Sequence, residues 1–191
     1  MARWASPLAL TWVLFAGAAA CSPSQGFRPA GSLDLGRDNE LGLALSRVGP
    51  RPYINETAQF VGQGWWSTRL DEHWSLTAIG AFDEGSAAGG GALRFDIASG
   101  RWAALATEAE VGLFWAAVSV PVSLRLWRGM ALYSAPRLGV WGPELTPFIP
   151  LGVSGQIVER LLLRAEAQVS WSDFQYYNRR VHLGLAVAYQ W

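Results

Sequence analysis

A serine, a histidine and a glutamate near the end of the chain are the residues whose types and spacing could perform chemistry. Ser170, His182 and Glu166 would supply a nucleophile, a general base and a carboxylate that orients the base. A hairpin joining their two segments could bring Ser170 beside His182, with Glu166 one step deeper. The competing interpretation, which we favour, is one histidine among polar neighbours inside the fold.

Other chemical signals are sparse. One cysteine and two histidines exclude an internal disulfide, a cysteine-based zinc cluster and a histidine-rich metal site. Gly89-Gly90-Gly91 lacks the Lys-Ser/Thr that would follow in a phosphate-binding loop. Fifteen acidic residues balance fifteen basic ones, which gives no support to nucleic-acid binding. We therefore expect no metal, no cofactor and no nucleic-acid partner.

The composition bounds the class of protein. The chain has 191 residues, of which 51% are hydrophobic, 13% aromatic and 16% charged. The charged share lies well below the ~25% of ordinary soluble proteins. High hydrophobicity without net charge excludes an intrinsically disordered chain, and the length suits one domain.

The first twenty residues have the pattern of an export signal. Arg3 precedes an uncharged run that ends in Ala18-Ala19-Ala20-Cys21. This ending resembles the lipobox of bacterial lipoproteins, which implies cleavage before Cys21 and diacylation of its thiol. Ser22, in place of the inner-membrane retention signal Asp, implies sorting to the outer membrane. We expect a signal peptide at 1–20, a lipid-anchored flexible tether at 21–39 and a folded domain at 40–191. An ordinary cleaved signal followed by a stray cysteine is the alternative.

The folded domain alternates with a period of two. In the last segment, apolar residues occupy every second position from Val181 to Trp191, and the positions between them are polar or small. Such alternation predicts half-buried strands rather than helices. We expect ten strands, at 40–47, 56–69, 74–82, 88–98, 101–112, 115–127, 130–140, 147–158, 161–171 and 180–191. Eight strands is the alternative, because no clear turn separates 101–112 from 115–127.

Tight turns and longer links also alternate along the chain. The tight turns fall at 71–73, 99–100, 128–129 and 159–160, and the longer links at 48–55, 83–86, 141–146 and 172–179. This is typical of outer-membrane barrels, which have short periplasmic turns and longer outer loops. An even number of strands places both termini on the periplasmic side.

Three features favour an apolar face turned outward. Tryptophans cluster near strand ends and would form two interfacial girdles. One girdle would hold Trp65, Trp66, Trp74, Trp102, Trp127 and Trp191, and the other Trp115, Trp141 and Trp171. The polar face is rich in glycine and alanine, which suits a narrow lumen. The chain ends with Leu183, Leu185, Val187, Tyr189 and Trp191 at alternate positions, which resembles the assembly signal of outer-membrane proteins.

By pattern, residues 40–191 resemble small bacterial outer-membrane β-barrel proteins. The resemblance implies an all-β, antiparallel, up-and-down transmembrane barrel in the outer membrane. It also implies outer-membrane lipids and the assembly machinery as partners. It is a resemblance of architecture and names no functional family.

Eight charged residues fall on the lumen face of the expected strands. They are Arg94, Asp96, Glu108, Glu110, Arg125, Arg137, Arg164 and Glu166. Buried charges require partners, so we expect these to pair and to plug the lumen. The leading prediction is a lipid-anchored outer-membrane barrel with a structural or interaction role.

Three alternatives remain. One is a narrow channel for small solutes. Another is an outer-leaflet lipid-modifying enzyme or protease, an activity known among small outer-membrane barrels. The last is a soluble periplasmic lipoprotein with a lipocalin-like barrel, in which Leu185 and Val187 would point inward.

Overall fold

The computed structural model describes residue 27 and residues 37–50, 57–82, 87–113, 115–127, 129–141, 144–171 and 179–191. No helix in these ranges is long and apolar enough to cross a membrane. The regular elements are twelve strands. In chain order they are β1 (Asn39–Val48), β2 (Gln59–Arg69), β3 (Trp74–Phe82), β4 (Ala87–Ser99), β5 (Ala103–Gly112), β6 (Trp115–Ser119), β7 (Val122–Trp127), β8 (Met130–Ser134), β9 (Arg137–Trp141), β10 (Glu144–Val158), β11 (Leu161–Trp171) and β12 (Arg179–Gln190).

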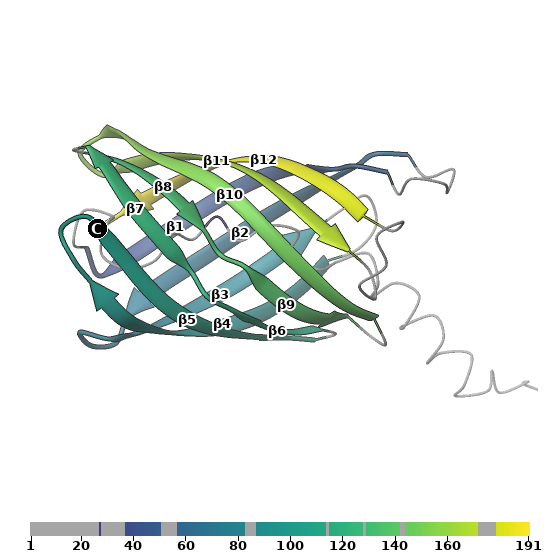
Figure 1. Ribbon diagram of the computed structural model, residues 1–191, viewed down its shortest axis with the longest axis horizontal. Helices are drawn as coiled ribbons and strands as arrows, with labels where there is room; N and C mark the ends of the chain where they lie inside the picture. Colours follow the sequence, from purple (N-terminus) through teal and green to yellow (C-terminus); the bar gives the residue numbers. More distant parts are fainter. Residues whose placement is uncertain are drawn as a thin grey trace, which may run out of the picture.

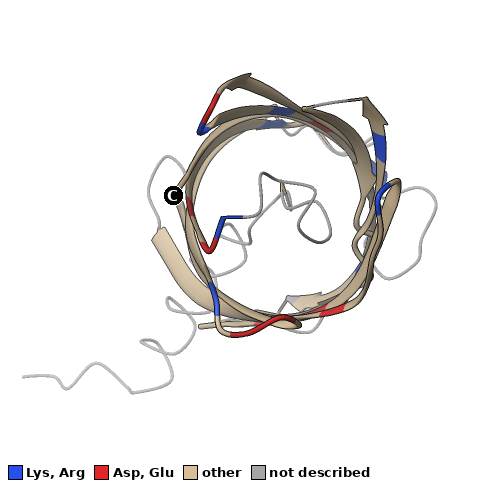
Figure 2. Cartoon of the chain, turned by 90° about the vertical axis from the view of Figure 1, so that its left-hand side faces the viewer, with Lys and Arg blue, Asp and Glu red and all other residues tan. Residues whose placement is uncertain are grey.

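The strands form a closed antiparallel barrel that is ten strands around. The strands from β1 to β6 and from β9 to β12 pair consecutively, β6 pairs with β9, and β12 returns to pair with β1, which closes the ring. Figure 1 shows the strands inclined to the long axis, and Figure 2 shows the ring seen along the barrel. The prediction of an all-β, ten-stranded barrel is confirmed, and the eight-stranded alternative is wrong.

Two positions in the ring are each occupied by a pair of strands. β6 and β7 both pair with β5, and β8 and β9 both pair with β10. Pro121 and Pro136 lie at the two interruptions, where a missing N–H removes a bond from the ladder. The Ala106 N–H still donates to the Pro121 carbonyl at 2.9 Å, and the Val120 N–H to the Pro136 carbonyl at 3.0 Å. Together, β6 and β7 therefore correspond to the strand predicted at 115–127, and β8 and β9 to the strand predicted at 130–140, each with a local break.

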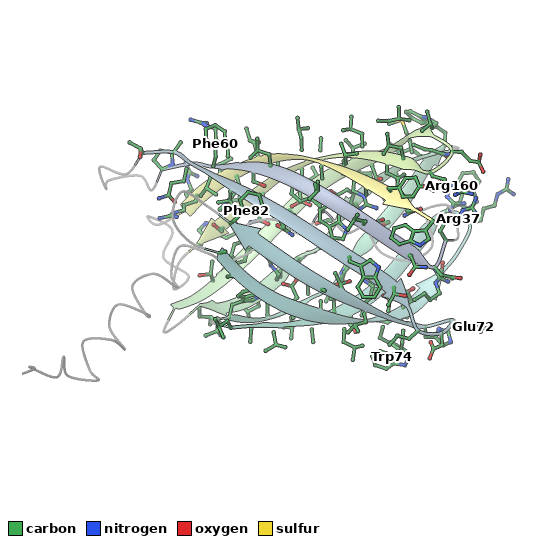
Figure 3. The ribbon with its side chains drawn as sticks, turned by 180° about the vertical axis from the view of Figure 1, so that it is seen from behind. Arg37, Phe60, Glu72, Trp74, Phe82 and Arg160 are labelled. Carbon is green, nitrogen blue, oxygen red and sulfur yellow. The ribbon has the colours of Figure 1, made fainter. Side chains whose placement is uncertain are left out.

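The apolar face points outward. Leu185 is 60% exposed and Val187 is 45% exposed, whereas Ala186 and Ala188 between and beyond them are buried. Side chains project from the outside of the barrel all along its length, including Phe60 and Phe82 (Figure 3). This is the opposite of a lipocalin-like barrel, so that alternative is wrong. A closed ring with an apolar exterior leaves no strand edge in lipid.

Two predicted girdle tryptophans instead point into the barrel. Trp65 and Trp115 are both buried. Gly42 and Gly112 make room for them, since a Cβ on either glycine would lie 2.0 Å from the Trp65 ring and 2.3 Å from the Trp115 ring, respectively. Neighbouring side chains of a strand point to opposite faces, so Trp65 points inward while the next residue, Trp66, is exposed. Proximity to a strand end therefore did not identify the outward face.

The remaining predicted tryptophans of the first girdle are exposed near the short turns. They are Trp66, Trp74, Trp102, Trp127 and Trp191. Trp74 is labelled near that end in Figure 3. In the second predicted girdle, Trp171 is half-buried, and the side chain of Trp141 lies outside the described part.

The short turn between β2 and β3 is built around Asp71. Its carboxylate accepts hydrogen bonds from the backbone N–H groups of His73 and Trp74, both at 2.7 Å. These bonds stabilise the ionised form and lower the pKa of Asp71 below its usual value. The chain then enters β3 directly. We call this end of the barrel, to which Asn39 and Trp191 also belong, the short-turn end.

Candidate functional site

The candidate site is the polar wall of the lumen. The buried polar and charged residues of the strands lie at positions that alternate with the exposed apolar ones, so they face inward. They are Ser46, Gln63, Thr77, Glu108, Glu110, Ser119, Ser123, Arg137, Thr146, Ser154, Arg164, Glu166, Gln168, Ser170, His182 and Gln190. In the described part of the chain, no three His, Cys, Asp or Glu residues are placed to hold a metal ion.

A glutamate near the short-turn end accepts four hydrogen bonds from side chains. The Glu40 carboxylate accepts two from the Arg164 guanidinium, at 2.7 and 2.6 Å. Trp65 donates a third from its indole N–H at 2.7 Å, and Gln190 a fourth from its amide at 2.8 Å. We call Glu40, Trp65, Arg164 and Gln190 the Glu40 cluster. The Glu40 side chain is 13% exposed. A carboxylate with this many donors and a two-bond arginine partner is fully compensated.

Phe27 is attached to the same wall from a distant part of the sequence. Its side chain is fully buried, and its ring lies parallel to the Trp65 ring, with centroids 6.3 Å apart. Its backbone N–H donates to the Glu166 carboxylate at 3.0 Å, and its carbonyl accepts from Arg164 at 2.8 Å. Phe27 belongs to the segment expected to be a flexible tether, and its side chain is held inside the barrel.

Two further ion pairs lie along the wall. Arg94 meets Glu108 at 2.9 Å between the adjacent strands β4 and β5. Arg137 on β9 meets Glu110 on β5 at 3.4 Å, across β6. The Arg137 guanidinium also lies over the Phe148 ring, 4.7 Å from its centroid.

The expected charge network is therefore brought together in part. Each pair links neighbouring or next-but-one strands and so follows the wall instead of crossing the lumen. Asp96 and Arg125 are half-buried, each beside a register shift of its strand. Neither forms an ion pair with another described residue. Glu166 binds the Phe27 N–H.

The expected nucleophile and base do meet. Ser170 Oγ lies 2.8 Å from His182 Nε2. The contact is diagonal, because Gln168 lies directly opposite His182 and Ser170 lies opposite Arg180. Both side chains are buried. The orienting carboxylate is missing: Glu166 lies opposite Gly184, and His182 Nδ1 has no hydrogen-bond partner among the described residues. The structure thus holds a serine–histidine pair and not the predicted triad.

The five residues of the expected assembly signal all face outward. Leu183, Leu185, Val187, Tyr189 and Trp191 are exposed, and the Tyr189 and Trp191 rings are stacked at 5.9 Å. The backbone of Trp191 exchanges hydrogen bonds with Asn39, at 3.1 and 3.2 Å. The last residue of the chain therefore contributes to the closure between β12 and β1.

The sequence did not identify Glu40, Trp65 and Gln190 of the Glu40 cluster, or Phe27 beside it, as site residues. Glu40 and Gln190 lie directly opposite each other on β1 and β12, a contact that exists only once the ring is closed. Glu40 alternates with outward-facing leucines on β1, and Gln190 alternates with Val187 and Tyr189 on β12. This pattern could have predicted that both residues point inward. Nothing in the sequence marked Phe27. Cys21 and the predicted signal peptide at 1–20 lie outside the described residues.

Comparisons with known proteins support the fold. No family model and no curated protein matches the chain. Among solved structures, a KdgM porin is similar with a TM-score of 0.50 and 6% identity, over 80% of this chain and 99% of that one. The same figures hold for "KdgM porin in complex with disordered oligogalacturonate". Ail, the attachment invasion locus protein of Yersinia pestis, is similar with a TM-score of 0.41 and 11% identity, over 81% of this chain and 97% of that one. These neighbours are outer-membrane β-barrel proteins, and at such identities the likeness is one of fold.

Proposed function

We propose that this chain is an outer-membrane β-barrel lipoprotein with a structural or interaction role, whose lumen is closed to solutes. The single observation that carries the proposal is the Glu40 cluster with Phe27 packed on it. A conducting lumen needs hydrated polar groups along its wall. Here the half-buried Glu40 carboxylate is satisfied by protein donors.

The size of the inward side chains supports closure. Tryptophan, tyrosine, phenylalanine and arginine side chains fill inward positions around the ring, among them Trp65, Trp115, Tyr133, Phe148 and Arg164. The interior of an eight-stranded barrel is just wide enough for side chains, and ten strands widen it only modestly. Large side chains at these positions therefore occupy much of the available space.

A narrow channel for small solutes is the second candidate. The ion pairs follow the wall instead of crossing the lumen, which is the arrangement that a passage would require. A porin also has a similar fold. This candidate differs from the first in one measurable property, which is steady conductance.

Planar-bilayer recording of the purified full chain tests the two candidates. A closed lumen predicts little or no steady conductance when insertion is verified by folding-dependent mobility in gels. A stable open pore in the wild-type chain would refute closure and establish the channel. Arg164→Ala, which removes a wall side chain, should raise conductance, whereas the outward neighbour variant Leu163→Ala should not.

The lipid anchor is a separate part of the proposal. It rests on Ala18-Ala19-Ala20-Cys21 and on Ser22 after it. A thiol alone in an oxidising compartment is a liability that acylation removes. Mass spectrometry of the mature protein should find its N-terminus at an acylated Cys21. An unmodified Cys21, or a mature chain that starts elsewhere, would refute the anchor without affecting the barrel.

A further inference from the structure

The surroundings of Phe27 have the composition of a ligand site. Its ring packs in a buried apolar cluster with Trp65, Leu162, Ala186 and Ala188. The indole forms one wall parallel to the ring, and alanines leave space for a flat group. Aromatic rings stacked in this way gain more than their buried area alone provides.

Two charged side chains bind the backbone of Phe27 on both sides of its Cα. The Glu166 carboxylate accepts from its N–H at 3.0 Å, and the Arg164 guanidinium donates to its carbonyl at 2.8 Å. Both side chains are buried, with 4% and 1% exposure. An acceptor and a donor at this spacing match the N–H and C=O groups of one amino-acid residue.

The backbone conformation of Phe27 shows that these contacts dominate its local geometry. Its φ is 45°, in a region that bulky residues rarely adopt. Such a conformation persists only where the surroundings determine it. The contacts with Trp65, Arg164 and Glu166 are the described interactions that do so.

We propose that Trp65, Leu162, Arg164, Glu166 and Ala186 form a binding site for an aromatic residue of a peptide, and that Phe27 occupies it in cis. Trp65 and Ala186 accept the ring, and Glu166 and Arg164 bind the backbone amide groups on its two sides. Without the Phe27 side chain, the place of its ring beside Trp65 is open to an aromatic ring from solution. This inference does not depend on whether the barrel conducts.

Ligand binding to the full-length Phe27→Ala chain in detergent tests the inference. The probe is the N-acetyl methylamide of 4-fluorophenylalanine, followed by ¹⁹F NMR, with the alanine analogue labelled on its acetyl group as the negative control. A tethered occupant has an effective concentration on the order of millimolar. The probe should therefore bind Phe27→Ala at least about tenfold more tightly than the wild-type chain. The alanine analogue should not bind.

Two adjacent tryptophans provide the matched control. In the Phe27→Ala background, Trp65→Ala should abolish probe binding, and Trp66→Ala, on the outer face, should leave it unchanged. Equal binding to wild type and Phe27→Ala would overturn occupancy by Phe27. Absence of binding to a folded Phe27→Ala barrel, or binding that survives Trp65→Ala, would overturn the site.

Crosslinking provides a measurement that needs no added ligand. A benzophenone amino acid in place of Phe27 should crosslink to peptides of β2, β11 and β12. The same group in place of Arg37, whose guanidinium reaches Glu159 at the rim, should not crosslink to Trp65 or Ala186. Failure of the position-27 probe to label these strands in a folded barrel would refute the inference, whatever the conductance.

Discussion

Arg164 and Glu40, 124 positions apart in the chain, meet inside the barrel in two hydrogen bonds of 2.7 and 2.6 Å. Arg164 belongs to β11 and Glu40 to β1, with β12 between them. The contact therefore spans the seam at which the last strand pairs with the first. The pair therefore adds a side-chain link to the backbone pairing of β12 with β1 at the short-turn end.

Replacing Arg164 should destabilise the barrel strongly. Arg164→Ala leaves the half-buried Glu40 without its cation, which costs roughly 3–5 kcal/mol where the site is dry. Glu40→Gln in the same background should recover part of the loss, because it removes the unpaired charge. Denaturant titration of the barrel refolded in lipid vesicles measures the free energy of unfolding. Unchanged stability of Arg164→Ala would show that the pair contributes nothing to the fold.

A methyl group at Gly42 should disturb the lumen wall. A Cβ there would lie 2.0 Å from the Trp65 ring, so that the indole must leave its place beside Glu40 and Phe27. Gly42→Ala should lower the free energy of unfolding by about 1–3 kcal/mol, as overpacking does. Gly80→Ala is the matched control, because nothing lies within 4 Å of its Cβ position. Equal effects at both positions would contradict the packing account.

Much of the fold could be predicted from the sequence because lipid imposes a strict alternation. Each strand that crosses the membrane alternates between lipid and lumen, so strand positions and faces follow from a period of two. The segments predicted at 115–127 and 130–140 are correct even though Pro121 and Pro136 break their ladders. Proline interrupts hydrogen bonds without changing which face a neighbour occupies.

The pairing across the closed ring could not be predicted in the same way. Parity places Glu40 and Arg164 on the inner face, but it does not give the stagger that brings them together across β12. The adjacent Trp65 and Trp66 illustrate the same gap. One of the two must face inward, and the choice is visible only in the folded barrel, where Gly42 leaves space for the Trp65 ring. The contacts of Phe27 depend on tertiary structure alone.

The longer links should lie outside the cell. This expectation follows from the alternation of short turns at one end of the barrel with longer links at the other. Thr57 and Ser99 are suitable probe positions, because both are exposed and they lie at opposite ends of the barrel. Thr57→Cys and Ser99→Cys, each in a Cys21→Ala background, can be treated with a membrane-impermeant thiol reagent on intact cells. Thr57→Cys should react, and Ser99→Cys should react only after permeabilisation. The reverse pattern would invert the topology.

Deleting Trp191 should impair assembly in cells more than the fold itself. The deletion removes two backbone hydrogen bonds with Asn39, each with a net contribution of about 1 kcal/mol, together with one exposed ring. Outer-membrane yield should fall sharply, while the same chain still refolds in detergent. Trp191→Ala keeps the backbone bonds and separates the role of the ring from that of the main chain. Normal yield in cells would refute the assembly signal.

The central claim is that the outer apolar face of the barrel contacts lipid, and spin labels along β12 test it most directly. Single cysteines at positions 183 to 188, in a Cys21→Ala background, are labelled in reconstituted bilayers and compared by electron paramagnetic resonance. Labels at Leu183, Leu185 and Val187 should collide readily with oxygen and little with a polar nickel complex. Labels at Gly184, Ala186 and Ala188 should lack the high oxygen accessibility typical of lipid. High oxygen accessibility at the second set, or no alternation along the strand, would contradict the account.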